Sequence, residues 1–478
     1  MILPFVSNVH KYIKDIKLSL MSLMLFILLG GSLVQADIVI SGIQAIDLDT
    51  LPGGSTSTAH DINDAGNIVG SSDTLSGETH AFFLPSGGMM NDITTLPGGD
   101  NSHALGINDL NQVVGRSNHL NLITGDLVNH GFIWEGGVIR DLGAFPPQDD
   151  INSSSTATAI NNSGLISGSV DLAGVVWDLY GTPNYPPFPP SVRVTDPGPF
   201  APATTSDINE TGQAVGTLVT FITGFRWQAG VLESLGQLNP ALDCDAYGIS
   251  DLGEVVGRCL LGPPLHNHAV FWPDPDTVQD IDTLGGENSE ARDINNDRII
   301  VGSSETATGE TVAFVWHADF GMQSLGTLGG ANSKAFGINA DGQIVGESET
   351  TSGQVHATLW SVTYATSVLI DIKPGNHQNP INPRSKGKLT VAILTTDEFD
   401  ANTVDTSTIR FGPDAAQPVW YRLKDVDHDG DWDLVLKIKT QETGIVCGDT
   451  EAMLNAQTLD GDQITGKDGI RTVGCKNK

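Results

Sequence analysis

The chain has 478 residues, which is enough for two or three domains. Its 57 acidic residues outnumber its 24 basic residues, for a formal net charge of −33. This charge would repel a phosphate backbone, so a nucleic-acid partner is excluded. The 55 glycines and the scarcity of helical periodicity predict an all-β chain with many tight turns.

Residues 1–36 have the pattern of a secretory signal peptide. An apolar run from Leu18 to Leu33 is followed by Val34-Gln35-Ala36, a small-residue cleavage site, and is preceded by Lys11, Lys14 and Lys17. The alternative is an anchoring helix, but a run of about 16 residues is shorter than the roughly 20 that span a bilayer. We therefore expect a secreted or cell-surface protein with no membrane span once the signal is removed.

Residues 37–361 repeat one pattern seven times. The clearest copy runs from Ala335 to Ser348 and shows apolar alternation, a four-residue break, and apolar alternation again. This pattern predicts two short antiparallel strands joined by a tight turn. The copies are separated by 41 to 53 residues and centre on Asn63, Asn108, Asn161, Asn209, Ser250, Asn295 and Asn339.

The break in each copy has the residues of a hairpin turn. The side chain of Asn339 can bond to backbone two residues on, and Gly342 accepts a left-handed conformation. Most copies have Gly at the second position, and the second copy has Asn111, the next best residue. Arg298 is a poor residue there, so we expect the sixth copy to turn differently.

Two further strands complete each unit. One ends in Trp, as in His356 to Trp360, and the other is an Asp-Leu-x-x-Leu-Pro-Gly-Gly stretch, as in Asp47 to Gly54. Four strands in about 45 residues is the spacing of propeller blades. One such sheet cannot bury both of its faces, so neighbouring units must stack. The sequence therefore predicts a seven-bladed β-propeller of four-stranded repeats.

Residues that recur in every unit serve packing and turns. We expect an inter-blade core, rather than a carbohydrate-stacking surface, from Trp134, Trp177, Trp227, Trp272, Trp316 and Trp360. We expect hydrogen-bonding groups at strand ends, rather than metal ligands, from His80, His130, His268 and His356.

The repeats resemble the bacterial extracellular HAF-repeat family over roughly residues 45–361. The resemblance rests on His80-Ala81-Phe82, which follows a Gly-Ile-Asn-x-x-Gly type of hairpin and precedes Leu-Pro-Gly-Gly. It implies a secreted repeat protein of bacteria and carries little further function. Three units depart from the pattern because they have Gly174, Gly224 and Val312 near the place of the His.

Function is expected where the repetition fails. The largest break runs from Asp178 to Thr205, with eight prolines and with aromatic residues that include Tyr180, Tyr185 and Phe188. So many prolines exclude a paired strand. The segment is either a recognition arm across one propeller face or a solvated insertion that tolerates length.

The four cysteines suggest two disulfides in an exported chain. Cys244 and Cys259 are equally distant from the turn formed by Ser250 to Gly253, so they face each other across the hairpin. Cys447 and Cys475 then pair by elimination. Four free thiols are the alternative.

Residues 362–367 read as a linker and residues 368–478 as a second domain. Lysines appear there, and about seven alternating runs predict a small β-sandwich. The opening Ile370 to Gly375 and the ending Ile470 to Cys475 resemble a C-terminal module of assorted secreted bacterial proteins, which implies no activity.

One loop of this domain has the pattern of a Ca²⁺ site. Carboxylates alternate around a Gly at Asp425, Asp427, Asp429, Asp431 and Asp433, with Asp431 expected to offer its backbone carbonyl. An EF-hand is excluded because its twelfth position is Leu436. We expect a structural Ca²⁺ ion, since five unpaired carboxylates so close together would repel one another.

No motif of a nucleophile elbow, zinc protease or phosphate loop is present, so no catalytic residue is assigned. The favoured interpretation is a non-catalytic exported protein that binds an extracellular glycan or protein through propeller loops. The alternative is a propeller-scaffold polysaccharide hydrolase or lyase, which needs two carboxylates at a channel mouth. Candidates for that pair are Asp149, Asp150, Glu233 and Glu254.

Overall fold

The computed structural model describes residues 38–121, 123–143, 153–171, 173–180, 191–193, 203–219, 223–239 and 242–475. These residues form strands β1 to β37 and two short 3₁₀ helices, so the prediction of an all-β chain is confirmed. The chain divides into a repeat unit, Ile40–Thr363, and a C-terminal unit whose main part is Tyr364–Lys478. The described part contains no helix that is both long and apolar enough to cross a membrane. The expected signal peptide, residues 1–36, lies outside the described residues.

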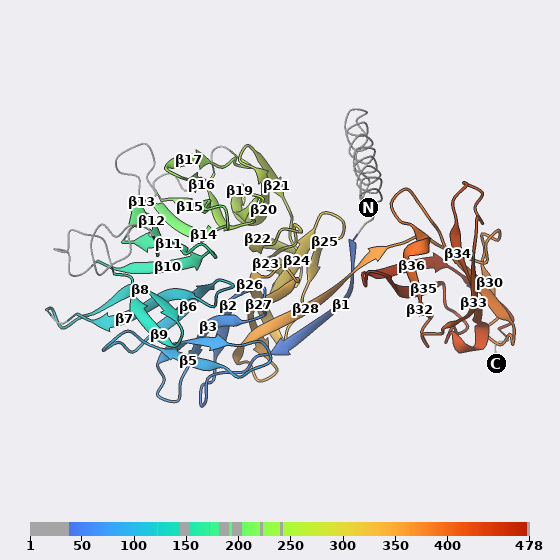
Figure 1. Cartoon of the computed structure of the whole chain (residues 1–478), viewed down its shortest axis with the longest axis horizontal. Helices are drawn as coiled ribbons and strands as arrows, with labels where there is room; N and C mark the ends of the chain where they lie inside the picture. The colour runs from blue at the N-terminus through green and yellow to red at the C-terminus, as the bar shows by residue number, and fades with distance from the viewer. Residues whose placement is uncertain are drawn as a thin grey trace, which may run out of the picture. The chain divides into compact units, whose positions relative to one another are not determined.

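The repeat unit is propeller-like and consists of small antiparallel sheets that follow one another along the chain (Figure 1). Six of them have four strands each, in sequence order. The first three are β2 to β5 (Ser57–Ile62, Ile68–Asp73, Thr79–Leu84, Asn91–Thr94), β6 to β9 (Ser102–Ile107, Val113–Leu120, Leu127–Glu135, Val138–Asp141) and β10 to β13 (Ser155–Ile160, Leu165–Val170, Ala173–Asp178, Ser191–Arg193). The next three are β14 to β17 (Ala203–Ile208, Ala214–Leu218, Thr223–Gln228, Val231–Ser234), β18 to β21 (Cys244–Ile249, Val255–Leu261, His266–Asp274, Thr277–Asp280) and β22 to β25 (Gly285–Ile294, Ile300–Thr306, Thr311–His317, Gly321–Ser324).

The last sheet of the repeat unit is completed by the start of the chain. It contains β26 (Gly329–Ile338), β27 (Gln343–Thr350) and β28 (Val355–Ser367), and β28 also pairs with β1 (Ile38–Asp47). Residues 362–367, expected as a linker, form the end of β28. The pairing of β1 with β28 was not anticipated, because β1 belongs to no repeat of its own.

Hydrophobic side chains of neighbouring sheets share one core. The cluster around Phe82 and Ile62 of the first sheet also contains Val345 and Ala357 of the last sheet. Likewise Val256 and Phe271 pack with residues of the following sheet. The expected stacking of neighbouring units is confirmed. So is the core role of the recurrent Trp residues, because five are buried and Trp134 is partly buried against the core.

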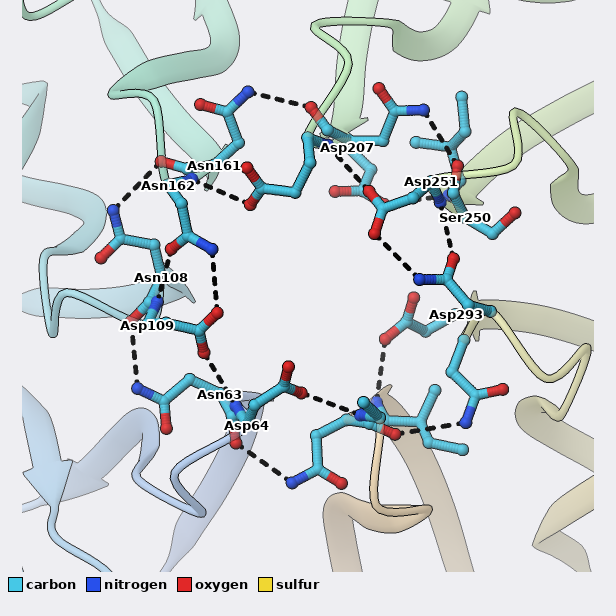
Figure 2. A pocket seen from close by; sticks show the side chains of 18 of the residues that line it. Asn63, Asp64, Asn108, Asp109, Asn161, Asn162, Asp207, Ser250, Asp251 and Asp293 are labelled. Carbon is cyan, nitrogen blue, oxygen red and sulfur yellow. Dashed lines mark hydrogen bonds between the residues drawn. The ribbon is translucent and has the colours of Figure 1, made fainter. Parts of the chain in front are cut away.

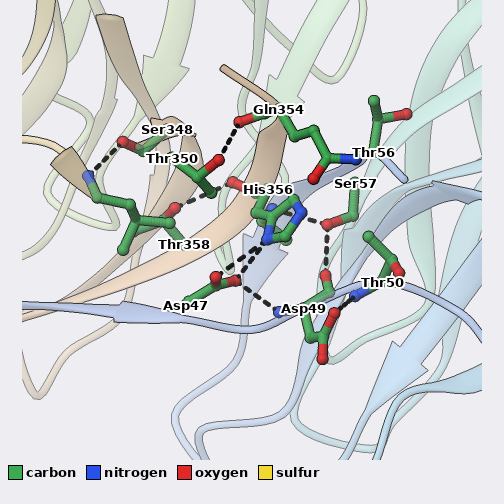
Figure 3. A network of polar contacts seen from close by, with 12 residues as sticks. Asp47, Asp49, Thr50, Thr56, Ser57, Ser348, Thr350, Gln354, His356 and Thr358 are labelled. Atoms are coloured by element: carbon green, nitrogen blue, oxygen red, sulfur yellow. Dashed lines mark hydrogen bonds and ion pairs between the residues drawn. The ribbon is translucent and has the colours of Figure 1, made fainter. Parts of the chain in front are cut away.

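The recurrent His residues bond to aspartates at the strand ends, as predicted. The His Nδ1 atom lies 2.9–3.1 Å from a carboxylate oxygen in each of the pairs His80–Asp92, His130–Asp141, His268–Asp280 and His356–Asp47. The last pair joins the two ends of the repeat unit (Figure 3). Beside it, the Leu48 amide donates to the Ala357 carbonyl at 2.9 Å.

Three expectations about the repeat unit were wrong. The proline-rich segment was expected to exclude a paired strand, but its residues Ser191–Arg193, which include no proline, form β13 and pair with β12. The sixth hairpin turns like the others, because Arg298 itself adopts a left-handed φ of 62°. The ion pair between Arg298 and Glu254, at 2.8 Å, stabilises this residue. The Leu-Pro-Gly-Gly segment of the first units is also a turn and not a strand, since β5 ends at Thr94.

The C-terminal unit contains two larger sheets that share one hydrophobic cluster. One has the order β29 (Ile370–Ile372), β31 (Lys388–Ile393), β34 (Asp433–Lys439) and β33 (Pro418–Lys424). The other joins the end of β28 to β36 (Gln463–Gly469), β35 (Glu451–Thr458) and β32 (Val404–Phe411). A short pair, β30 (Pro380–Ile381) and β37 (Arg471–Thr472), and the 3₁₀ helices η1 (Ala401–Thr403) and η2 (Thr440–Glu442) complete it. Val391 and Leu436 of one sheet pack with Phe411 and Leu454 of the other.

Both predicted disulfides are formed. Cys244 and Cys259 are directly opposed in β18 and β19, with a Cα–Cα distance of 4.1 Å. Cys447 and Cys475 have a Cα–Cα distance of 5.9 Å. The first pair is buried in the core of the repeat unit, whereas Cys447 is exposed.

This difference in burial predicts the order in which the disulfides are reduced. Dithiothreitol must reach a sulfur atom to attack it, so Cys447–Cys475 should open well before Cys244–Cys259 under native conditions. Alkylation during a time course, followed by peptide mass spectrometry, measures the order. Equal rates for the two disulfides would show that the fifth sheet opens as easily as the C-terminal unit.

Candidate functional site

The hairpin between the first and second strands of a sheet is held by an asparagine, except in the fifth sheet, where Ser250 takes its place. In the first sheet, the Gly66 amide donates to the Asn63 carbonyl at 2.9 Å. The side-chain Oδ1 of Asn63 accepts from the Asn67 amide, also at 2.9 Å. The Oδ1 atom thus closes its own turn, but through the amide four residues on and not two residues on as predicted. The NH₂ group of the same side chain is left to bind elsewhere.

That NH₂ group bonds to the next sheet. The Asn63 Nδ2 atom donates to the backbone carbonyl of Asn108, at 3.0 Å. The same bond recurs at 2.9–3.2 Å from Asn108 to Asn161, Asn161 to Asn209, Asn209 to Ser250, Asn295 to Asn339 and Asn339 to Asn63. The bond from Asn339 to Asn63 joins the last sheet to the first, so the bonds form a ring that is interrupted only where Ser250 replaces the asparagine (Figure 2). We call it the asparagine ring.

The following residues form a second series of bonds around the same centre. The Asp251 amide donates to the Asn296 Oδ1 atom at 2.9 Å, which links the two sheets that Ser250 leaves unconnected. Corresponding bonds join the residue pairs 64–109, 109–162, 162–210, 210–251 and 340–64. Every neighbouring pair of sheets is therefore joined by at least one of the two series.

Three aspartates lie just before this turn in the first, fourth and sixth sheets. Asp61 accepts from the Ile62 amide and from the Ile107 amide of the next sheet, both at 2.8 Å. Asp207 and Asp293 make the same two bonds at 2.7–3.0 Å, to Ile208 and Ile249 and to Ile294 and Ile338. One oxygen of each carboxylate thus bonds within its own sheet and the other bonds to the next sheet.

Burial makes these carboxylates hard to ionise. It raises the pKa of Asp61 to about 7 and the pKa of Asp207 to about 6. Burial also raises the pKa of Asp293 well above its ordinary value, and the charges of Asp207 and Asp61 add to this rise. The negative charges of Asp61 and Asp207 thus disfavour the ionisation of Asp293.

The next sheet always has glycine where the aspartate would recur. A Cβ atom on Gly248 would lie 2.9 Å from the Asp293 Cα atom, and one on Gly337 would lie 3.2 Å from the Asp61 Cα atom. Sequence reasoning missed these aspartates. The signal was present, because Asp-Ile-Asn occurs in three repeats where the others have Gly or Ala before the Ile.

The turns surround a pocket of about 380 Å³ at this end of the repeat unit (Figure 2). All seven hairpins contribute to its lining, which includes Asp207 and Asp293 and an outer set of Asp64, Asp109, Glu210 and Asp251. Burial and the charges of neighbouring carboxylates raise the pKa of Glu210. The pocket is lined with hydrogen-bond acceptors and suits ligands that carry hydroxyl or ammonium donors.

The predicted recognition arm lies mostly outside the described residues, including Tyr185 and Phe188. Tyr180 is 65 % exposed, and its hydroxyl accepts from the Gln112 Nε2 atom at 2.9 Å. Its ring packs over Gly164, where a Cβ would lie 2.5 Å from a ring carbon. Tyr180 is therefore held against neighbouring sheets at the beginning of the arm.

Of the carboxylates proposed for a hydrolase, Glu233 and Glu254 do not line the pocket. Glu233 pairs with Arg226 at 2.8 Å, and the buried Glu254 pairs with Arg298. Asp149 and Asp150 lie outside the described residues. The acidic groups that do line the pocket are those of the hairpins.

The acidic loop of the C-terminal unit connects β33 to β34. Asp425, Asp427 and Asp433 bring one carboxylate oxygen each within 4.8 Å of one another. Asp433 is buried and accepts from the amides of Thr395 and Val426 at 3.0 and 2.8 Å. Asp429 and Asp431 are not part of this group. Burial and the Asp433 charge raise the pKa of Asp427, so a cation with hard oxygen ligands fits these three residues.

A second group of possible metal ligands lies in the repeat unit. His119, His130 and Asp141 also place one ligand atom each within 4.8 Å of one another. Asp141 and His130 keep the pairing seen in three other sheets. Only His119, whose buried Nδ1 atom has no hydrogen-bond partner among the described residues, is specific to this position.

The asparagine ring predicts opposite effects for two substitutions. Asn161→Ser should keep its turn, as Ser250 does by accepting from Glu254, but should leave the Asn209 carbonyl unbonded at a cost of about 1–3 kcal/mol. Ser250→Asn should add the missing bond to residue 295 and stabilise by about 1 kcal/mol. Urea unfolding of the repeat unit measures both. A destabilising Ser250→Asn together with a neutral Asn161→Ser would contradict the role of the ring.

The buried aspartates predict that stability falls as pH rises. The folded pKa of Asp61 is about 7 and its ordinary value is 3.8, so the folded state binds this proton more tightly than the unfolded state. The contribution of this proton to the free energy of unfolding is fully present below about pH 4 and is lost as pH rises through 7. The contribution of Asp207 is lost in the same way as pH rises through about 6. Asp61→Asn should flatten this fall, whereas Asp73→Asn should leave it unchanged, because the Asp73 pKa is lowered. A fall of equal slope in Asp61→Asn would contradict the assignment.

No protein-family model matches the sequence, and no curated protein matches it. Among solved structures, the chain is similar to virginiamycin B lyase from Staphylococcus aureus, with 10 % identity, a TM-score of 0.41, and coverage of 67 % of this chain and 99 % of that one. It is also similar to a gluconolactonase from Xanthomonas campestris, with 10 % identity, a TM-score of 0.31, and coverage of 69 % and 95 %. A fucose-specific lectin from Aleuria aurantia matches with 8 % identity, a TM-score of 0.32, and coverage of 56 % and 94 %.

Proposed function

We propose that the chain is an exported, non-catalytic binding protein. Its repeat unit is a seven-bladed β-propeller that binds an extracellular glycan or protein through the hairpins around the ring pocket. Its C-terminal unit is a β-sandwich that serves as an accessory domain stabilised by Ca²⁺. The N-terminal signal pattern and the two disulfides support export, since disulfides persist in oxidising compartments. The resemblance to secreted HAF repeats supports the same proposal.

The binding role is supported by one observation: hydrogen bonds to backbone amides, some of them from the neighbouring sheet, already fix polar groups of the pocket. Asp207 and Asp293 each use both oxygens to accept amides, so they act as anchors of the ring. The pocket is therefore preorganised, and a ligand would not have to order it on binding. Its acceptor-rich lining suits the hydroxyl groups of a glycan or the ammonium groups of a protein.

Polysaccharide cleavage is the second candidate function. It is favoured by the raised pKa values of Asp207, about 6, and Asp293, because a general acid must hold its proton near neutral pH. Release of reducing ends or unsaturated products from polysaccharides, abolished by Asp207→Asn, would favour this alternative over binding alone.

The binding proposal predicts that the chain binds its ligand more weakly when the outer carboxylates of the ring pocket lose their charge. Glycan and protein arrays identify ligands of the full chain, and Asp109→Asn combined with Glu210→Gln should weaken their binding at least about tenfold, through loss of charge-assisted hydrogen bonds. Asp126→Asn, an exposed change outside the pocket, is the matched control. Arrays without any ligand, together with polysaccharide cleavage, would contradict the proposal.

The Ca²⁺ proposal predicts a chelator effect on the C-terminal unit. Removing a bound ion with EDTA should lower the melting temperature of this unit in the full chain, since a ligand at 100 times its Kd stabilises by about 2.7 kcal/mol. Asp425→Asn with Asp427→Asn should abolish the response, whereas Asp460→Asn, in an exposed turn outside the loop, should retain it. Identical melting with Ca²⁺ and with EDTA would contradict the assigned loop.

A further inference from the structure

One sheet of the C-terminal unit has a polar outer face. In β31 and β34, side chains such as Val391 and Leu436 belong to the hydrophobic core. Because side chains alternate along a strand, Thr390 and Lys437 face away from that core. The register pairs Lys437 with Trp420 and Val435 with Arg422, so the outward side chains of β33 lie beside them.

This outer face contains a groove of about 390 Å³. Its lining includes Lys373, Thr390, Trp420, Arg422, Lys424 and Lys437. Four of these side chains are cationic, and none of the residues lining the groove is acidic. A basic groove is unexpected in a chain with a net charge of −33, and it would attract a ligand of negative charge.

The positive charges of the groove are not neutralised within the protein. Among the ion pairs of the described residues, none involves any of the four cations of the groove. Lys437 Nζ donates to the Thr390 hydroxyl at 2.5 Å, and Lys373 Nζ donates to the Pro380 carbonyl. Both acceptors are neutral, so each ammonium group is positioned while its charge stays available to a ligand.

An aromatic surface accompanies these charges. Trp420 is 44 % exposed, and the Arg422 guanidinium lies 5.4 Å from the centre of its ring. Cations on an edge strand also protect against edge-to-edge aggregation. That role does not explain Lys437, which lies on the inner strand β34.

We propose that this groove binds an acidic polysaccharide, with the cations contacting its carboxylates and Trp420 contacting the face of a sugar ring. Arginine pairs with carboxylates through two parallel hydrogen bonds, and exposed indoles supply a flat apolar surface. Proteins that bind single-stranded nucleic acids stack successive bases on several aromatic side chains, whereas Trp420 is the one aromatic residue among those lining the groove. This site is separate from the ring pocket and adds a second ligand to the protein.

Affinity electrophoresis of the full chain tests the proposal, with polygalacturonate as the probe and neutral dextran and oligo-dT as comparators. Retardation by polygalacturonate should exceed that by either comparator and should weaken as salt is raised. Arg422→Gln combined with Lys424→Gln should reduce the apparent affinity about tenfold or more, and Trp420→Ala should do so about fivefold. Trp420→Phe, which keeps an aromatic face, should restore most of the binding.

Lys467→Gln is the matched control, because it removes one exposed positive charge from β36 of the other sheet. It should bind polygalacturonate like the unchanged chain. The proposal is overturned if dextran or oligo-dT retards the chain as strongly as polygalacturonate, or if Lys467→Gln weakens binding as much as the groove variants. Melting temperatures within about 2 °C of the parent confirm that the variants are folded, and Trp420→Phe provides a folded comparison if Trp420→Ala is not.

Discussion

The fold of the repeat unit depends on one side chain that forms two hydrogen bonds in opposite directions. The Oδ1 atom of the hairpin asparagine closes its own turn, and its Nδ2 atom donates to the backbone of the next sheet. A short amide has the reach and both kinds of polar atom, whereas serine keeps only the first bond, as Ser250 shows. Where Ser250 replaces the asparagine side chain, the backbone N–H of Asp251 joins the same two sheets by donating to the Asn296 Oδ1 atom. Neighbouring sheets are thus held by polar bonds at the centre and by apolar packing farther out.

The same geometry defines what the pocket can do. The three aspartates next to the ring accept hydrogen bonds from two backbone amides each, but burial and the charges of nearby aspartates raise their pKa values. Their protonation near neutral pH therefore affects both the stability of the ring and the charge that a ligand would meet. In the C-terminal unit the local charge is reversed, because the groove beside Trp420 is basic. The protein thus offers one acceptor-rich and one cationic surface, which suit ligands of different charge.

The sequence predicted what depends on local spacing. Hairpin positions, the buried Trp residues and the Cys244–Cys259 pair follow from residues close in the chain. It could not show partners that are remote, such as the bond from Asn339 to Asn63 across 276 positions or the pairing of β1 with β28. Arg298 misled because an ion pair with a neighbouring sheet offsets its unfavourable φ. Alternating carboxylates in the acidic loop indicated a cluster, and the side-chain oxygens of Asp425, Asp427 and Asp433 do lie together. The sequence could not show that backbone amides remote and near fix Asp433, because Thr395 is 38 positions away.

The repeat unit closes on itself through β1, which pairs with β28 of the last sheet. The Leu48 amide donates to the Ala357 carbonyl of the last sheet. The equivalent bond in the fifth sheet, whose strands follow one another in the chain, runs from the Ile281 amide to the Ala269 carbonyl at 3.0 Å. Native-state hydrogen exchange compares these two amides directly, because both follow an aspartate that pairs with a histidine. Closure predicts protection of Leu48 comparable to that of Ile281. Exchange of Leu48 at the rate of an unstructured amide, with Ile281 protected, would show that the ring is open.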